Sequence, residues 1–316
     1  MNGAEAPVLS LAGRPVARYV TRPELPARLS PRPHLHPVTT LAGTAVTESA
    51  PADHLHHLGV GVAVPDVEGH NFWGGRTYVR DRGPTELDNH GAQRHLSFPH
   101  RDPAGFTEEL RWVAAGRELL REHRTVRAVR LTPAAWALDL TFALTNVTGA
   151  PLGLGSPATN GRPGAAYGGF FWRARKEREA PDVFTAGATG EAAVHGSRAD
   201  WLALAGPSWT LVFAGGDERT RRDPWFVRTA EYPGAGSSLA HDARLPLAPG
   251  ATETRRIVTV VADGRLDAAG AAALAREAVG AQAGTPAPPR VPHPHPSTDH
   301  PPGDHPPRDR KKRADQ

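Results

Sequence analysis

The chain has 316 residues with 37 basic and 33 acidic side chains, a formal net charge of +4, and no cysteine. The absence of cysteine excludes disulfides, thiolate metal ligands and a cysteine nucleophile, and so small a net charge for this length gives no reason to expect a nucleic-acid partner. No apolar stretch approaches membrane-spanning length, and residues 1–10 lack the basic and apolar regions of a signal peptide. We therefore expect a cytoplasmic protein with no membrane and no nucleic-acid partner.

In chain order, the sequence predicts strands separated by turns that contain many of the 33 glycines and 32 prolines. Residues 59–64 (GVGVAV) are apolar on both faces. Residues 106–115 and 118–131 flank a glycine turn and predict a long hairpin, and residues 136–146 (WALDLTFALTN) alternate between apolar and smaller or polar side chains. Further strands are predicted at 168–175, 192–197, 201–204, 209–214, 225–230 and 252–262. Long alternating strands joined by hairpins favour an all-β fold, a large antiparallel β-sandwich.

One helix is predicted near the end of the sequence. Residues 266–279 (LDAAGAAALAREAV) are rich in alanine with helical spacing of apolar positions, and Asp263 or Asp267 is expected to cap them. Residues 285–316 hold ten prolines, four histidines and no aromatic side chain, so they cannot bury enough apolar surface to order themselves. We predict a single β-sandwich domain over 1–284, including this helix, and a disordered Pro/His/Arg-rich tail over 285–316.

Histidines concentrate in the N-terminal third, where nine of the sixteen lie between His34 and His100. Five belong to two short runs, His34-Leu35-His36 and Asp53-His54-Leu55-His56-His57. Histidine titrates near neutral pH and binds transition metals. We therefore expect the centre of a functional site at this histidine cluster.

Several sequence blocks resemble a known bacterial family. The blocks are RPHLHP (32–37), DHLHHLG (53–59), NFWGGRTY (71–78), LDNHG (87–91), YGGFFWR (167–173) and DPWF (223–226). Over about residues 15 to 262 they are similar to proteins labelled "methane oxygenase PmoA" or "PmoA family protein", which have no settled activity. By a weaker analogy, the resemblance implies the β-supersandwich of galactose mutarotases and related sugar-active proteins. The methane monooxygenase subunit of the same name is an integral membrane protein, and the soluble β pattern here does not fit it.

A sugar site is the leading interpretation. Pyranose rings stack on aromatic faces, and their hydroxyls need donors and acceptors in one plane. The residues that fit as sugar contacts are Asn71, Trp73, Arg76, Asn89, Trp172 and Arg173. The mutarotase analogy implies a histidine acid, for which the candidates are His54, His56 and His90, and a carboxylate base, for which they are Asp53, Asp88, Asp200 and Glu231. Core packing is the ordinary alternative for Trp73 and Trp172. Arg173 and Arg228 are candidates to line a cleft and clamp a carboxylate or a hydroxyl pair, and an outward-facing strand position is the alternative for both.

A metal site is the second interpretation of the same histidines. Two imidazoles with a carboxylate suit Fe, Mn or Zn, and in an extended chain His54 and His56 share one side while His57 takes the other. The cupin signature is not met, because the next acidic residues are too far on. The expected third ligand is His36, with His34, His90 and His95 as alternatives. The alternative is a purely structural role, in which these imidazoles hydrogen-bond to the backbone and to carboxylates and Asp53 caps a turn.

Three functions therefore stay open: a carbohydrate-active protein with epimerase-like or lyase-like chemistry, a metal-dependent enzyme, and a non-catalytic sugar-binding module. The expected partner is a small-molecule substrate of the sugar type. No cofactor is predicted apart from the divalent metal of the second interpretation. We predict that His54, His56 and at least one of His34, His36 or His90 lie in one concave site.

Overall fold

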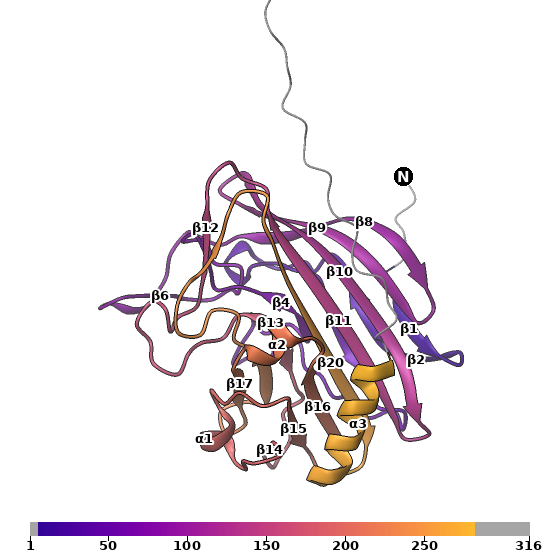
Figure 1. Cartoon of the computed structure of the whole chain (residues 1–316). Helices are drawn as coiled ribbons and strands as arrows, with labels where there is room; N and C mark the ends of the chain where they lie inside the picture. Colours follow the sequence, from indigo (N-terminus) through magenta and orange to yellow (C-terminus); the bar gives the residue numbers. More distant parts are fainter. Residues whose placement is uncertain (1–5, 282–316) are drawn as a thin grey trace, which may run out of the picture. The chain divides into compact units, whose positions relative to one another are not determined.

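The computed structural model describes residues 6–281 (Figure 1). The predicted domain boundary at 284 and the predicted tail at 285–316 lie outside this range. The described chain is nearly all β, and every pairing between its strands is antiparallel. The predicted antiparallel β-sandwich with one C-terminal helix is confirmed.

The larger sheet has eight strands and holds the longest hairpins of the chain. In spatial order its strands are β14 (Asp182–Phe184), β15 (Trp201–Ala205), β16 (Trp209–Gly215), β20 (Thr252–Asp263), β11 (Ala135–Asn146), β10 (Arg117–Thr132), β9 (Gly105–Ala114) and β8 (Ala92–Asp102). The predicted hairpin is β9–β10, and it turns at Ala115-Gly116, both with positive φ.

The second sheet has seven shorter strands and carries most of the segments that reach the candidate site. In spatial order they are β1 (Val8–Leu11), β2 (Arg14–Val20), β3 (His34–Val38), β4 (Val60–Ala63), β13 (Gly169–Arg173), β18 (Gly234–Ser237) and β17 (Trp225–Arg228). Two small sheets complete the strands, namely β19 (Leu245–Leu247), β12 (Leu152–Gly155) and β5 (Asp66–Val67) in one, and β6 (Thr77–Val79) with β7 (Gly83–Thr85) in the other.

The alternation along β11 explains how the eight-stranded sheet buries both faces. Its large side chains join the main core, which also takes Leu35, Val60 and Trp172 from the second sheet. These large residues are Trp136, Leu138, Leu140, Phe142 and Leu144. Ala135 and Ala137 face the opposite way and join a second core cluster with the alanines of α3 (Ala268–Ala281), which covers the outer face beside β20 and β16 (Figure 1). Side chains two residues apart share one face of a strand, so large and small positions separate.

The helices are few and short. α3 matches the predicted helix within two residues, and Asp267 caps it by accepting a hydrogen bond from the Gly270 N–H at 2.8 Å. The strand predicted at 192–197 is wrong, because α1 (Glu191–Val194) and a turn occupy it. The others are α2 (Glu218–Arg222) and a 3-10 turn at Ala27–Leu29. Within residues 6–281, no helix combines the length and the apolar character needed to cross a membrane.

A charged network lies buried between the sheets. Arg124, fully buried, donates to both oxygens of Glu122 at 2.7 and 2.9 Å and to the Tyr19 hydroxyl at 2.9 Å. The Tyr19 hydroxyl in turn donates to Glu108, whose other oxygen bonds His95 Nδ1 at 2.7 Å. His95, one of the alternative metal ligands, is therefore committed to the structural network. Buried charges survive where each has such partners.

Candidate functional site

One cavity of about 470 Å³ gathers the histidine run with an aromatic wall. It lies where the loop before β4, the loop after β5 and the ends of β13 and β17 meet. We call it the histidine–aromatic cavity, defined by His54, His56, His57, Trp73, Tyr167, Phe226 and Tyr232. Its other charged lining residues are Asp53, Arg76, Glu86, Arg162, Arg228 and Glu231. A volume of this order is typical of small-molecule sites.

The histidine run is folded rather than extended. The His54 N–H donates to the Pro51 carbonyl and the His57 N–H to the His54 carbonyl, both at 2.9 Å, so two tight turns follow each other. The three imidazoles consequently meet in one cluster, with ring centroids 4.6 Å apart for His54 and His57 and 4.7 Å apart for His56 and His57. The expectation that His57 points away from His54 and His56 is wrong, because the alternation rule applies only to extended chain.

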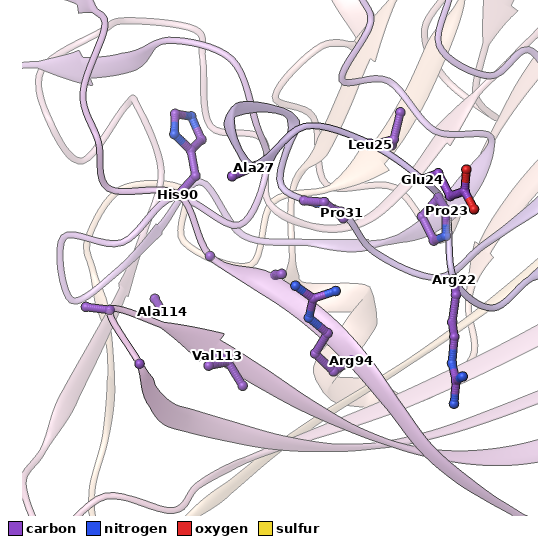
Figure 2. Close-up of a pocket in the computed structure, with 14 residues that line it drawn as sticks. Arg22, Pro23, Glu24, Leu25, Ala27, Pro31, His90, Arg94, Val113 and Ala114 are labelled. Carbon is purple, nitrogen blue, oxygen red and sulfur yellow. The ribbon is translucent and has the colours of Figure 1, made fainter.

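The other histidines expected at the site lie elsewhere. His34 is buried, where its Nε2 bonds Ser49 Oγ at 3.2 Å, and burial lowers its pKa to about 4. His36 Nδ1 bonds Thr47 Oγ1 at 3.0 Å. His90 Nε2 donates to the Gly75 carbonyl at 2.7 Å, and His90 is at the edge of another cavity of about 550 Å³, with its ring directed away from the other labelled residues (Figure 2). The prediction that His34, His36 or His90 joins His54 and His56 in one concave site is therefore wrong. The third histidine of the cavity is His57.

The predicted metal ligands are not brought together. His54 and His56 both line the cavity, but His36 lies outside the lining and hydrogen-bonds to Thr47. In the part of the chain from 6 to 281, no group of three or more histidine, aspartate or glutamate side chains is arranged to hold a metal ion. A third ligand from these residues would require a rearranged loop.

Burial and nearby cations keep two of the imidazoles uncharged. Burial, followed by the positive charge of Arg32, lowers the pKa of His56 to about 3. Burial, followed by the neighbouring imidazoles and then Arg173, holds the pKa of His57 well below its ordinary value. An imidazole in this state donates from one nitrogen and accepts at the other. His56 and His57 are therefore hydrogen-bonding groups and not acids at neutral pH.

Asp53 and His54 form a carboxylate–imidazole pair at the cavity. Asp53 Oδ2 lies 3.3 Å from His54 Nδ1, and the two side chains are 44% and 28% exposed. Burial alone would raise the pKa of Asp53, but the adjacent His54 imidazole and the charge of Arg173 outweigh it and lower the pKa. Asp53 is thus ionised, and its carboxylate is the acceptor nearest to His54 Nδ1, a buried atom that makes no hydrogen bond of regular geometry. A proton on Nδ1 faces this carboxylate and leaves Nε2 as the accepting nitrogen.

Arg173 does not line the cavity but contacts two residues that do, His57 and Tyr232. It is fully buried, and its Nε and Nη2 donate to Glu48 Oε2 at 3.1 and 2.8 Å. Its Nη1 donates to His57 Nδ1 at 3.3 Å, and its guanidinium lies 4.8 Å from the Tyr232 ring centroid. Arg173 therefore positions a histidine and a tyrosine of the cavity, and direct sugar contact does not fit its burial.

A second buried arginine, missed from the sequence, ties two parts of the lining together. Arg32 is 3% exposed and donates to the Trp73 carbonyl at 2.8 Å and the His56 carbonyl at 2.7 Å. Burial, followed by the charge of Arg124, lowers its pKa to about 9, so it stays charged at neutral pH. Its position in the first histidine block was visible, but the long-range partners were not.

Two predicted sugar contacts, Asn71 and Asn89, serve the loops instead. Asn71 Oδ1 accepts from the backbone N–H groups of Trp73 and Gly74 at 2.8 and 2.9 Å, and its side chain is buried. Asn89 donates to the Gly69 carbonyl at 2.8 Å. Asn71 and Asn89 thus use these hydrogen bonds to hold the loops around Trp73. They are therefore assigned to loop structure and not to sugar contact.

The remaining predictions divide between cavity and core. Trp73 lines the cavity, and Arg76 lies at its rim, where it pairs with Glu86 at 3.1 Å. Trp172 is fully buried and donates to the Val46 carbonyl at 2.9 Å, so it belongs to the core. Of the carboxylates considered as a base, Asp53 and Glu231 line the cavity, whereas Asp88 and Asp200 do not.

Three aromatic lining residues were not singled out from the sequence. The Tyr167 ring lies 4.6 Å from that of Trp73 and 5.4 Å from that of Phe226. The Tyr232 ring lies 4.8 Å from both His54 and His57, and burial raises its pKa, so its hydroxyl stays protonated. Tyr167 and Phe226 belong to two of the sequence blocks described above, which was their only visible signal.

The fold and cavity define a β-sandwich protein with a histidine–aromatic pocket. The family of unknown function DUF6807 matches residues 6–276, and the chain belongs to it. No curated protein matches the sequence. The resemblance to PmoA-family proteins and galactose mutarotases stays a prediction.

Two solved structures are similar over most of this chain. One is a polysaccharide lyase with 10% identity and a TM-score of 0.34, covering 81% of this chain and 34% of the lyase. The other is a heparan sulfate lyase HepC mutant from Pedobacter heparinus with 8% identity and a TM-score of 0.39, covering 79% and 34%. The chain spans about a third of each lyase. Likeness at this level says nothing about activity.

Proposed function

We propose that this protein binds a sugar or sugar derivative in the histidine–aromatic cavity and catalyses a proton transfer from the bound sugar to His54. The observation that carries the proposal is the carboxylate-paired imidazole of His54 in the same cavity as Trp73, Tyr167 and Tyr232. Sugar recognition needs an aromatic face next to convergent polar groups. Proton transfer needs a group whose protonation state can change at that position.

The aromatic wall supplies the binding part. Trp73 and Tyr167 pack against each other with an interplanar angle of 42° and both reach the cavity. The uncharged imidazoles of His56 and His57 line the same cavity and offer donors and acceptors without a charge to desolvate. Binding a neutral hydroxyl to a neutral imidazole avoids the cost of burying an ion.

The Asp53–His54 pair supplies the chemistry. With its proton held on Nδ1, His54 accepts a substrate proton at Nε2, and the Asp53 carboxylate stabilises the imidazolium that results. The protonated hydroxyl of Tyr232, whose ring packs beside that of His54, is available as a donor. This assigns His54 as a base oriented by a carboxylate, whereas the mutarotase analogy implied a histidine acid.

The test combines binding with isotope exchange. The full chain is titrated with glucose, galactose, mannose and their uronic acids by calorimetry, and each sugar is then incubated with protein in D₂O and followed by NMR. We expect at least one sugar to bind and to exchange a carbon-bound hydrogen for deuterium, and we expect His54→Gln to abolish this exchange. His100→Gln is the matched control, because His100 also pairs with a carboxylate, Asp102, at 3.0 Å but lies outside the cavity lining.

Each outcome decides between the interpretations. Binding that survives in His54→Gln without any exchange in the parent protein would favour a non-catalytic sugar-binding module. Exchange that persists in His54→Gln would remove His54 from the chemistry. Failure of every sugar to bind would reject the proposal.

A further inference from the structure

We propose that the ligand of the histidine–aromatic cavity is an anionic sugar, whose carboxylate or phosphate group is held by Arg162 and Arg228. This inference rests on the proposed function and names the substrate class of the same cavity. Both arginines line the cavity on the side of Tyr167 and Phe226. Guanidinium groups bind carboxylates and phosphates through two parallel hydrogen bonds.

Arg162 is available for a ligand. It lies in the loop between β12 and β13 and is exposed to solvent. Its guanidinium lies close to the Tyr167 side chain, whose pKa it lowers against the larger effect of burial. Within residues 6–281 it forms no ion pair, so an incoming anion meets a guanidinium that no carboxylate already neutralises.

Arg228 is held rigidly and keeps unused donors. It donates to the Val227 and Gly164 carbonyls, both at 2.9 Å, and its guanidinium lies 4.8 Å from the Phe226 ring centroid. A guanidinium has five N–H donors, so about three remain. A fixed guanidinium loses less side-chain entropy on binding than a free one.

The carboxylate closest to Arg228 is committed to another task. Glu191 Oε1 lies 3.8 Å from Arg228, beyond hydrogen-bonding distance. Glu191 Oε2 accepts from the N–H groups of Thr229 and Ala230 at 2.7 and 3.1 Å. Burial would raise the pKa of Glu191, but these hydrogen bonds outweigh it, so the carboxylate stays ionised and bound to the turn.

Two of the carboxylates that line the cavity already have partners of their own. Asp53 pairs with His54 and lies 3.8 Å from Arg173, and Glu86 pairs with Arg76 at the rim. The remaining lining carboxylate, Glu231, is exposed. Below the imidazoles, the buried charge of Arg32 forms no ion pair within residues 6–281 and adds to the positive potential. The cavity-lining cations near Tyr167 and Phe226 are Arg162 and Arg228, and they favour an anion at this end of the cavity.

The experiment compares matched sugars on the full chain. Glucose, glucuronate and glucose 6-phosphate are titrated by calorimetry at low salt, together with the galactose and mannose series. We expect at least one acidic sugar to bind at least about tenfold more tightly than its neutral counterpart, since a charge-assisted hydrogen bond contributes that much. Whether the uronate or the phosphate ester of that sugar binds more tightly distinguishes the two anion sources.

Variants then assign the effect. Arg162→Gln is expected to weaken binding of the acidic sugar about tenfold more than binding of its neutral counterpart. Arg111→Gln is the matched control, because Arg111 is an exposed arginine of β9 outside the cavity lining, and it should change neither affinity. Circular dichroism of each variant confirms folding.

The outcomes separate this inference from the proposed function. Equal binding of neutral and acidic sugars would overturn the inference while the proposed function stands. An equal loss for both sugars in Arg162→Gln would overturn the assignment of the anion to Arg162. Binding of no sugar at all would overturn both proposals.

Discussion

Replacing Arg173 with methionine gives a direct test of how the cavity is held together. The change removes two hydrogen bonds to Glu48, one to His57 and the contact with the Tyr232 ring. Breaking a buried ion pair typically costs about 3–5 kcal/mol. The lower end applies here, because the Glu48 side chain is 31% exposed and water partly replaces its lost partner. We therefore expect a loss of about 3 kcal/mol in the free energy of unfolding.

For a domain of this size, such a loss corresponds to a Tm lower by about 6–12 °C. Urea unfolding of the full chain at pH 7 measures the free energy, and Arg173→Lys serves as the intermediate case because it keeps the charge but not the planar fork. Sugar binding should weaken in Arg173→Met, since His57 and Tyr232 lose their common support. An unchanged free energy of unfolding, within about 0.5 kcal/mol, would show that this guanidinium does not anchor the cavity floor.

Three further predictions concern stability and geometry. Arg124→Met should lower the free energy of unfolding by about 3–5 kcal/mol in urea, because the fully buried carboxylates beside it lose their cation; a loss below 1 kcal/mol would contradict this. Gly75→Ala places a Cβ 3.0 Å from His56 Nδ1, so sugar affinity should fall, whereas Gly83→Ala, with similar positive φ but open space, should cost only backbone strain. The folded pKa values of about 4 for His34 and about 3 for His56 lie below the ordinary 6.5, so stability should be full above pH 6.5 and decline as pH falls towards these values; a flat pH profile of unfolding between 6.5 and 4 would disprove it.

The strands with strong alternation were predictable, and those with mixed composition were not. β11 was recognisable because each large residue falls two positions from the next and faces the core. β8 was missed because it is a half-exposed edge strand in which charged and apolar side chains intermix. The strand predicted at 192–197 failed because α1 is only four residues long, too short for a helical pattern to stand out.

The local sequence predicted where the candidate site lies, whereas only the tertiary structure shows which residues line it. The run from Asp53 to His57 was singled out by composition alone, and it does line the cavity. Its backbone, however, is folded by two turns, and this reverses the expected direction of His57. Pro51 and Asp53 favour the first turn, but nothing in the local sequence indicates the second turn, from His54 to His57.

The sequence by itself determined which chemical groups were available: clustered imidazoles, no thiols, and an alternating pattern that specifies a sandwich. Only the folded chain decided which of these groups share a solvent-accessible hollow. Tyr232 and Arg228 join His54 there from more than 170 positions away in the sequence, through the pairing of β17 with β18 and of β13 with both β18 and β4. Such contacts depend on sheet order and register, which are set by packing across the whole core and leave no local mark in the sequence.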